Sequence, residues 1–466
     1  KVLTLPVNQD VRVFQLLATV MDQLRQTGEE FVSENLKKLS VRRAPRVTVG
    51  ITLSGDLLDL TLSSEKLPFG ELEGLLQSYR QRKKYYRLKD GDFLRLEDNS
   101  VSALAEIMEG LSLDGRDLQA GSCRIPRFRA FYLDQVFREA KEGIEIQRSQ
   151  SFKSMIRNMK SADDSDFEVP DHLKGTLRNY QKAGYRWLCT LEAMGFGGIL
   201  ADDMGLGKTI QMIAFLCARY EKEGDAAGAP SLIVCPASLV YNWEGELDRF
   251  APQLRKKVLV GNREERKEIY DHYSEFQILI TSYDILKRDV EDYRGLEFYC
   301  EVLDEAQYIK NHMTQAARAA KSVRAGVKFA LTGTPIENRL SELWSIFDYL
   351  MPGILGKYSG FQKEYEIPIV QHSDKIAARR LQKMIKPFVM RRLKKDVLKE
   401  LPDKIENVVY SRLQGEQERV YAANVQKLLS QLEQPSGTGS QGEKFQVLAQ
   451  LTRLRQICCD PGLVYE

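Results

Sequence analysis

The sequence predicts an α/β protein whose main domain is a parallel sheet with helices on both faces. Short apolar runs of strand length alternate with segments of helical periodicity through the middle of the chain, which is the pattern of such a sheet. These runs lie at residues 197–201, 231–235, 256–260, 277–281, 298–304 and 328–331. We expect a small α+β domain before this sheet and a mostly helical segment after it.

The N-terminal part of the chain shows hairpin signals and no catalytic signature. The runs at 47–53 and 57–62 alternate in polarity around a Ser-Gly-Asp turn, and a second pair at 83–89 and 92–96 flanks Asp90-Gly91. Helical spacing is found at 11–25, 101–112 and 131–142. The sequence therefore predicts two hairpins and several helices in this part.

Tyr79, Tyr85 and Tyr86 stand among six basic residues within the stretch 79–89. Aromatic side chains between cations suit stacking on single-stranded nucleic acid. They also suit a hairpin whose tyrosines pack inward, which is the interpretation we favour.

Composition divides the chain into four parts. The stretch 161–175 is acidic and polar and contains Pro170 and Gly175, so we interpret it as a linker. The predicted parts are an accessory domain at 1–160, the linker at 161–175, the sheet domain at 176–352 and a helical segment at 353–466. Within the last part, residues 404–410 resemble a strand and residues 433–442 a flexible loop.

Charge and cysteine usage narrow the classes of function. The formal net charge is only +3, so local clusters of basic residues must carry any argument for nucleic-acid binding. The seven cysteines form no Cys-x-x-Cys pair and there are four histidines, which disfavours a zinc site and a disulfide framework and fits a reducing, cytosolic compartment. No apolar run approaches the ~18 residues of a membrane span. The first residues lack an initiator Met and a signal peptide, so we expect the chain to begin within a longer protein.

The segment DDMGLGKT has the features of a phosphate-binding loop between a strand and a helix. Gly205 and Gly207 let the backbone approach phosphate oxygens, Lys208 places a cation on the β- and γ-phosphates, and the hydroxyl of Thr209 can bind Mg²⁺. The common pattern begins with glycine, and Asp202 stands at that position. A surface turn with a chance Gly-Lys-Thr is the alternative.

The segment EVLDEAQ is an apolar strand that ends in two adjacent carboxylates. Asp304 would hold Mg²⁺, directly or through water, and Glu305 would polarise the attacking water. Alone, the pair could be an ordinary helix N-terminal charge pattern. Together with the phosphate-binding loop, it predicts one nucleotide site at the carboxyl ends of the strands.

A third polar loop follows a strand in ALTGTPIENRL. Gly333, Thr334 and Pro335 could sense the state of the γ-phosphate and transmit it to a neighbouring surface. A plain turn is the alternative.

Several long motifs in their order along the chain resemble the Swi/Snf branch of the superfamily-two nucleic-acid motors. They are LRNYQKAGYRWL (177–188), ILADDMGLGKTIQ (199–211), LIVCPASLVYNWEGEL (232–247), VLDEAQYIKN (302–311), LTGTPIENRLSELWSIFDYL (331–350), IKPFVMRRLKKDVLKELPDKIE (385–406) and LTRLRQICCDP (451–461). The resemblance covers about 171–466, and this family writes its phosphate loop D-[DE]-M-G-L-G-K-T, without the first glycine. More weakly, the first ~150 residues resemble the extra domain upstream of the motor in bacterial members.

The resemblance implies a RecA-like lobe that binds ATP and Mg²⁺. Gln181 would read the adenine, with Arg178 near the same pocket. The remaining ATP-binding positions would be Asp203, Met204, Gly205, Leu206, Gly207, Lys208 and Thr209. Gln307 replaces the histidine of most eukaryotic members and is expected to couple the site to the neighbouring loop.

The resemblance also implies two segments that lie along a DNA strand. Their positions are Pro236, Ser238, Leu239, Asn242 and Trp243 in the first, and Thr281, Ser282 and Tyr283 in the second. For Trp243, ordinary core packing is an equal alternative. The basic run 375–404, which includes Arg391 and Arg392, fits DNA contact, a brace between two lobes or a solvated helix face.

The function expected from these residues and the resemblance is an ATP-dependent translocase of double-stranded DNA that remodels or displaces bound proteins. The partners would be DNA and, in a bacterium, RNA polymerase or nucleoid proteins, with a monomeric, nucleoid-associated protein and no membrane. The alternatives are a nucleotide-gated scaffold and a true strand-separating helicase. The family's second lobe supplies an arginine that is absent before Glu466, and such a group is worth roughly 10³–10⁵ in rate, so slow hydrolysis is expected of this chain alone.

Overall fold

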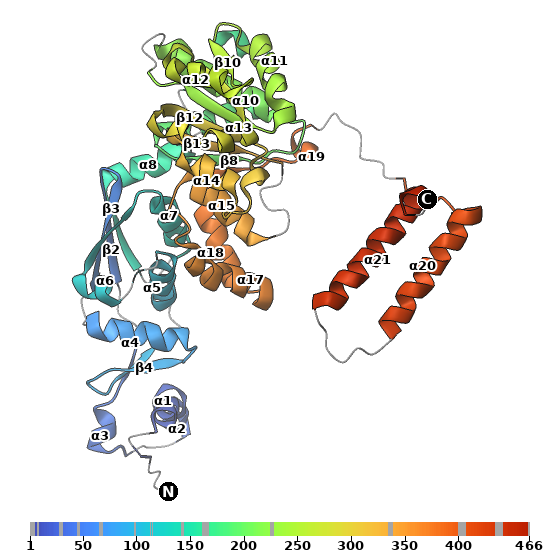
Figure 1. Ribbon diagram of the computed structural model, residues 1–466. Coiled ribbons are helices and arrows are strands. Elements are labelled where there is room, and N and C mark those ends of the chain that lie inside the picture. The colour runs from blue at the N-terminus through green and yellow to red at the C-terminus, as the bar shows by residue number, and fades with distance from the viewer. Residues whose placement is uncertain are drawn as a thin grey trace. The chain divides into compact units, whose positions relative to one another are not determined.

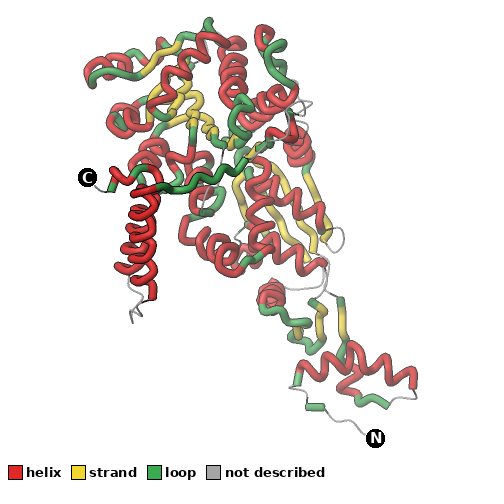
Figure 2. Tube along the Cα trace, turned by 90° about the vertical axis from the view of Figure 1, so that its right-hand side faces the viewer, coloured by secondary structure: helices red, strands yellow, loops and turns green. Residues whose placement is uncertain are grey.

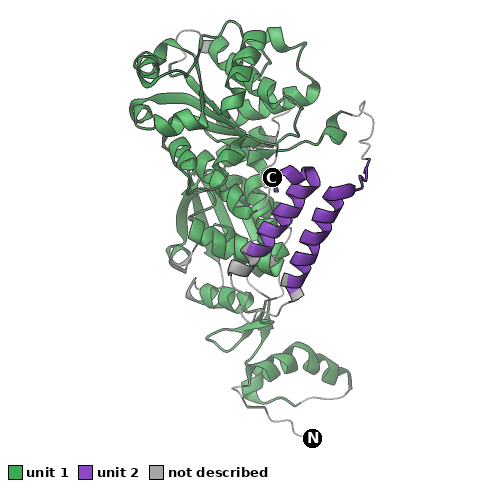
Figure 3. Cartoon of the chain, turned by 45° about the vertical axis from the view of Figure 1, so that its right-hand side comes forward, with its two compact units in different colours: residues 1–398 green, residues 399–466 purple. Residues whose placement is uncertain are grey.

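The computed structural model describes most of the chain and divides it into two compact units, residues 1–398 and 399–466 (Figure 3). The residues described are 5–6, 9–27, 31–43, 47–64, 69–96, 99–111, 113, 115–140, 144–160, 167–223, 228–333, 339–398, 407–433 and 441–464.

The first unit contains a seven-stranded sheet in the order β10-β11-β9-β12-β13-β8-β14, and every neighbouring pair is parallel (Figure 1). Its strands are β8 (Gly198–Leu200), β9 (Ser231–Cys235), β10 (Lys256–Val258), β11 (Ile278–Ser282), β12 (Glu297–Asp304), β13 (Arg324–Leu331) and β14 (Val389–Met390). The strands β8, β9 and β11 are buried along their whole length, as expected for a parallel sheet covered on both faces. The six strands predicted for this sheet are confirmed, whereas β14 was not predicted.

Helices connect the strands and cover the sheet (Figure 2). They are α9 (Asn179–Ala193), α10 (Lys208–Glu223), α11 (Val240–Phe250), α12 (Arg263–Asp271), α13 (Tyr283–Arg288), α14 (Gln315–Ser322) and α15 (Leu340–Leu350). Helix α10 buries Met212, Ile213 and Leu216 completely, so its apolar face is part of the hydrophobic core. The predicted α/β class is confirmed.

The N-terminal α+β region contains two small sheets. A four-stranded sheet has the order β6-β3-β2-β7 and a three-stranded sheet the order β1-β5-β4. Their strands are β1 (Val41–Arg42), β2 (Val47–Ser54), β3 (Leu57–Ser64), β4 (Tyr85–Arg87), β5 (Phe93–Arg95), β6 (Ser122–Pro126) and β7 (Ile144–Arg148). Both predicted hairpins are confirmed, since β2 pairs with β3 and β4 pairs with β5 in antiparallel fashion.

The helices of this region include the three that were predicted. They are α1 (Asp10–Gln15), α2 (Met21–Thr27), α3 (Glu34–Lys37), α4 (Phe69–Arg80), α5 (Asn99–Gly110), α6 (Gly115–Ala120), α7 (Arg129–Glu139) and α8 (Gln150–Lys160). Tyr85 stacks on Phe14 with ring centres 4.6 Å apart and meets Phe93 edge-on at 5.4 Å. The tyrosines of this hairpin thus pack inward, which is the interpretation the sequence favoured.

The helices after the sheet connect it to the N-terminal region. They are α16 (Tyr358–Phe361), α17 (Ile367–His372), α18 (Lys375–Ile385) and α19 (Lys394–Val397). Phe388 makes edge-to-face contacts with Phe131 of α7 at 5.6 Å and with Phe196, which precedes β8, at 5.5 Å. From α18, Arg380 pairs with Glu109, and Lys383 pairs with Glu106 and, at 2.9 Å, with Glu139.

We expect Lys383→Ala to lower the free energy of unfolding of the protein by about 2 kcal/mol, because it leaves two glutamates without their shared cation. The effect is moderated because the side chains of Glu106 and Glu139 are 30% and 54% exposed and keep part of their hydration. Denaturant unfolding followed by tryptophan fluorescence measures it, with Arg379→Ala on the exposed face of α18 as the matched control. Equal losses in the two variants would show that the buried ion pair contributes nothing.

The second unit is a helical hairpin of α20 (Gly415–Glu433) and α21 (Gln441–Cys459). The side-chain amide of Gln417 donates to the carbonyl of Ile457 at 2.8 Å, and Ile457 is fully buried between the helices. Residues 407–410 are exposed and form no strand, which corrects that part of the expected strand at 404–410; its first residues lie outside the described chain.

Among the described helices, none combines the length and the apolar character needed to cross a membrane. No cluster of metal-ligating side chains is found in the described part of the chain either. The predicted linker at 161–175 is described only from residue 167 onward, where a single 3₁₀ turn interrupts irregular chain. The predicted domain boundaries stay predictions.

Candidate functional site

The register of the parallel sheet places the strand ends of the predicted motifs side by side. Asp304 at the end of β12 pairs with Leu331 of β13, Leu331 pairs with Leu200 of β8, and Leu200 pairs with Met390 of β14. The loops that follow these strands therefore leave the sheet from the same edge. This is where ligands bind in open α/β sheets.

The phosphate-binding loop connects β8 to α10 and has the backbone geometry that such a loop needs. Gly205 and Gly207 have φ values of +83° and +74°, which other residues rarely adopt. A side chain at Gly207 would collide with the amide nitrogen of Gln181, at 2.5 Å. Both glycines are therefore required by the shape of the loop.

Lys208 is the first residue of α10, and its ammonium donates to the backbone carbonyl of Asp202 at 2.8 Å. Burial lowers the pKa of Lys208, and the carboxylates of Glu305, Asp202, Asp304 and Asp203 act against that shift. The structure thus brings the lysine of one motif together with the carboxylates of the other. Thr209 follows at the second position of the helix.

Asp304 is nearly buried, and both of its carboxylate oxygens have donors. Oδ2 accepts from the indole Nε1 of Trp243 at 2.8 Å, and Oδ1 accepts from the backbone N–H of Glu305 at 2.9 Å. Burial raises the pKa of Asp304, while the hydrogen bond from Trp243 lowers it. Trp243 therefore holds this carboxylate in place and favours its charged form.

Five side chains predicted to lie along DNA are buried, and the contact of these residues with DNA stays a prediction. They are Pro236, Trp243, Thr281, Ser282 and Tyr283. Trp243 and Tyr283 support the acidic motif, since the hydroxyl of Tyr283 donates to the carbonyl of Asp304 at 2.8 Å. Of the remaining predicted positions, Leu239 is half-buried, and Ser238 and Asn242 are exposed.

Gln307 connects the acidic motif to the third motif. Its amide nitrogen donates to Glu305 Oε2 at 2.6 Å, and its amide oxygen accepts from the hydroxyl of Thr332 at 3.0 Å. Gly333 follows Thr332 and faces Met204 of the phosphate-binding loop, because a side chain at Gly333 would lie 3.3 Å from Met204 Cγ. The predicted coupling residues Thr334 and Pro335 lie outside the described chain.

Gln181 lies against the phosphate-binding loop. Its side-chain nitrogen donates to the carbonyl of Leu206 at 3.1 Å, and its oxygen accepts from the backbone N–H of Arg178 at 2.9 Å. Arg178 is exposed at the start of α9. Both residues border the loop, and their contact with adenine stays a prediction.

The two arginines of the basic run differ in surroundings. Arg391 is exposed, whereas Arg392 pairs with the fully buried Asp202, with Nε 2.9 Å from Oδ1. The guanidinium of Arg392 is directed into the protein, and contact of either arginine with DNA stays a prediction. Arg380 and Lys383 also form internal ion pairs, so part of the basic run neutralises acidic groups of the same chain.

Comparison with known families identifies the chain. The model of the SNF2-related domain matches residues 180–463, more than half of the chain, and the model named bacterial SNF2 helicase associated matches residues 4–170. The chain belongs to the SNF2-related family.

The relatives of this SNF2-related chain are longer proteins. YwqA of Bacillus subtilis, provisionally named an ATP-dependent helicase/translocase, is 40% identical over 71% of this chain and 36% of its own length. The TATA-binding protein-associated factor MOT1 of Saccharomyces cerevisiae is 38% identical over 64% of this chain and 17% of its own length. The chain thus spans about a third or less of these relatives. A solved SWI2/SNF2 ATPase core from Sulfolobus solfataricus, in complex with double-stranded DNA, is 40% identical over 64% of this chain and 62% of that one, with a TM-score of 0.46.

The strand that ends in Asp304 also carries a fully buried acid. Glu301 of β12 is fully buried, its Oε2 lies 2.8 Å from the ammonium of Lys328, and the hydroxyl of Tyr349 donates to its carbonyl at 3.3 Å. Burial raises the pKa of Glu301 from 4.5 to about 7, although Lys328 acts against the shift.

This acid predicts a pH dependence of stability. Between pH 5 and pH 7 the unfolded chain carries the Glu301 charge while the folded protein holds the proton, so the free energy of unfolding falls as pH rises, by up to about 3 kcal/mol. Glu301→Gln should flatten that fall, and Glu297→Gln, an exposed glutamate of the same strand, should leave it unchanged. Unfolding midpoints measured at several pH values test this prediction. Identical slopes of stability against pH in wild type and Glu301→Gln would contradict the raised pKa of Glu301.

The sequence did not predict that Gly184, Gln211 and Arg392 lie around the loop of this SNF2-related site. A weak signal was available, since a glycine inside a predicted helix is unfavourable unless a neighbour needs the space. A side chain at Gly184 would lie 1.8 Å from Gln211 Oε1 and 2.8 Å from Arg392 Nη2.

Proposed function

We propose that this chain is part of an ATP-driven motor that translocates along double-stranded DNA and remodels or displaces the proteins bound there. The observation that carries the proposal is the group at the carboxyl edge of the sheet, where Lys208 lies among the carboxylates of Asp202, Asp304 and Glu305. Family membership supports it, because relatives of this chain are named as ATP-dependent helicases and as remodelling proteins.

The residues at this edge fit ATP with Mg²⁺. The two left-handed glycines leave room for phosphates beside the amides at the start of α10, and Lys208 supplies a cation whose only hydrogen bond among the described contacts is to a carbonyl. Asp304 and the hydroxyl of Thr209 offer the oxygen ligands that Mg²⁺ prefers. Bound there, the metal would neutralise charge on the β- and γ-phosphates.

Each residue of the site then has a defined task. Lys208 and the loop amides bind and orient the triphosphate, and Glu305 orients the attacking water and accepts its proton. Gln307 donates a hydrogen bond to the Glu305 carboxylate and accepts one from Thr332, so it couples the position of Glu305 to Thr332. Gln181 and Arg178 border the loop on the side where we place the adenine.

Double-stranded DNA is the proposed polymer. Exposed Ser238, Asn242 and Arg391 are the predicted contacts that keep access to a DNA backbone. Phosphate contacts make affinity fall steeply with salt. In a bacterial cell the displaced proteins would be RNA polymerase or nucleoid proteins, and the motor would act as a monomer associated with the nucleoid.

The test is ATP turnover by the full-length protein with duplex DNA, single-stranded DNA, RNA or no nucleic acid. We expect duplex DNA to stimulate turnover most, and we expect displacement of a triplex-forming oligonucleotide without unwinding of a forked duplex. Unwinding of the fork would favour the strand-separating helicase instead. Slow hydrolysis by residues 1–466 alone stays a prediction.

A nucleotide-gated scaffold is the second candidate, favoured by the extensive contact of the N-terminal region with α18. In that case ATP binding alone would suffice for protein displacement. Displacement that survives in Glu305→Gln, with turnover lost, would support the scaffold over the motor.

A further inference from the structure

Asp202 occupies the first position of the phosphate-binding loop, where the common pattern has glycine, and its carboxylate is completely buried. Oδ1 accepts from the backbone N–H of Arg392 at 3.1 Å and from its Nε at 2.9 Å. Oδ2 accepts from Arg392 Nη2 and, at 3.2 Å, from the amide of Gln211. A buried carboxylate persists only with a paired cation, and Arg392 is that cation.

The same guanidinium contacts the two helices on either side of the loop. Its Nη1 donates to the carbonyl of Tyr180 in α9, and its Nη2 donates to Gln211 Oε1 in α10 at 2.6 Å. The amide of Gln211 in turn donates to the carbonyl of Gly207 at 3.1 Å. The Arg392 side chain therefore connects the end of β8 to both helices and, through Gln211, to the second glycine of the loop.

The backbone on both sides of Arg392 is bonded to the loop as well. The N–H of Ala201 donates to the carbonyl of Met390 at 2.7 Å, the N–H of Asp203 to the carbonyl of Arg392 at 3.1 Å, and the N–H of Lys394 to Asp203 Oδ2 at 2.9 Å. Gly184 leaves the space that Arg392 and Gln211 fill. Residues 390–394 thus lie along the loop and are hydrogen-bonded to it.

We propose that Arg392 is a positioning residue for the phosphate-binding loop of this chain. By pairing with Asp202 it fixes the backbone of residues 202–203, so that the Asp202 carbonyl receives the ammonium of Lys208 and the loop amides are ordered before a nucleotide arrives. Arg392 acts through the loop and makes no contact with the nucleotide. This role rests on the proposed function, since it concerns the same nucleotide site.

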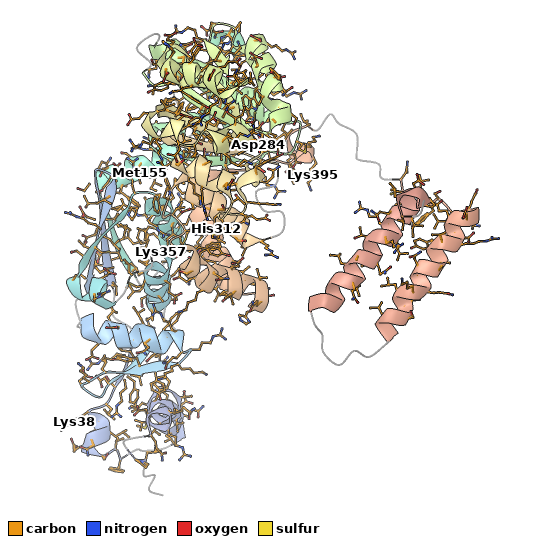
Figure 4. All side chains as sticks on the ribbon, viewed as in Figure 1. Lys38, Met155, Asp284, His312, Lys357 and Lys395 are labelled. Carbon is orange, nitrogen blue, oxygen red and sulfur yellow. The ribbon has the colours of Figure 1, made fainter. Side chains whose placement is uncertain are left out.

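The first measurement needs no nucleotide. Hydrogen–deuterium exchange of the full-length protein should show at least about ten-fold faster exchange across residues 201–209 in Arg392→Gln, with strand β11 unchanged. Lys395→Gln is the matched control, since Lys395 is an exposed cation of the same segment (Figure 4). Unchanged exchange across the loop in Arg392→Gln would overturn the proposal.

The second measurement is the Kd of a fluorescent ADP analogue with Mg²⁺, well below the unfolding temperature of each variant. Arg392→Gln and Asp202→Asn should each weaken binding at least ten-fold, and the double variant should be no weaker than Arg392→Gln. The proposal would be overturned if the losses of affinity in the two single variants multiplied in the double variant. It would also be overturned by a Kd of Arg392→Gln within two-fold of wild type. The double variant has no unpaired buried charge and replaces Arg392→Gln if that protein does not fold. If the wild type binds no nucleotide, the proposed function fails while the exchange measurement still tests Arg392.

Discussion

Glu305→Gln should reduce ATP turnover by about 10²–10⁴-fold while leaving ATP binding nearly unchanged, because it removes the group that accepts the proton of the attacking water. The substitution keeps size and shape, so contact with Gln307, now 2.6 Å from Glu305 Oε2, stays within reach. Residue 305 has a φ of +49°, and glutamine meets the same backbone constraint as glutamate. The loss therefore reports on chemistry and not on folding.

Steady-state turnover of the full-length protein with duplex DNA and saturating ATP measures this effect, and fluorescent-nucleotide titration measures binding. Glu297→Gln is the control, because Glu297 is an exposed carboxylate at the opposite end of β12. Turnover of Glu305→Gln within ten-fold of wild type would mean that another group activates the water.

Lys208→Ala should weaken nucleotide binding by about 10- to 100-fold, since a charge-assisted hydrogen bond to phosphate contributes ~1.5–3 kcal/mol. The carboxylates of Glu305 and Asp203 near Lys208 make the loss larger, because without the ammonium they repel the triphosphate. We expect turnover to fall further than affinity, since charge on the phosphates shifts in the transition state.

Titration with a fluorescent ATP analogue tests the affinity, and Lys222→Ala, an exposed lysine at the other end of α10, serves as the control. A Kd for Lys208→Ala within three-fold of wild type would contradict a phosphate site at this loop.

Features that depend on neighbouring residues were predictable from the sequence. The hairpins β2–β3 and β4–β5 follow from alternation around a turn, and the strands of the large sheet follow from buried apolar runs. Lys208 and the Asp304–Glu305 pair were predicted to meet because parallel strands end at one edge, and the register of β12, β13 and β8 places them there.

Features that depend on residues far apart in the chain were not predictable. For Trp243, the sequence left core packing and contact with DNA as alternatives. The structure shows that its indole donates a hydrogen bond to the carboxylate of Asp304, which is far from it in the chain. Strand β14 is only two residues long, so no periodicity marks it; its pairing with β8 defines it. The sequence showed Asp202 as a departure from the common loop, but its ion-pair partner, Arg392, lies far along the chain.

The place of β14 also bears on how the protein is made. During synthesis, β8 and its phosphate-binding loop emerge from the ribosome well before residues 389–392, which cover the outer edge of β8 and neutralise Asp202. Until then the nascent sheet has an unprotected edge strand, the kind of surface at which chains aggregate. We therefore expect the phosphate-binding loop to be ordered late in folding on the ribosome, because its order depends on contacts of high sequence separation, which form slowly.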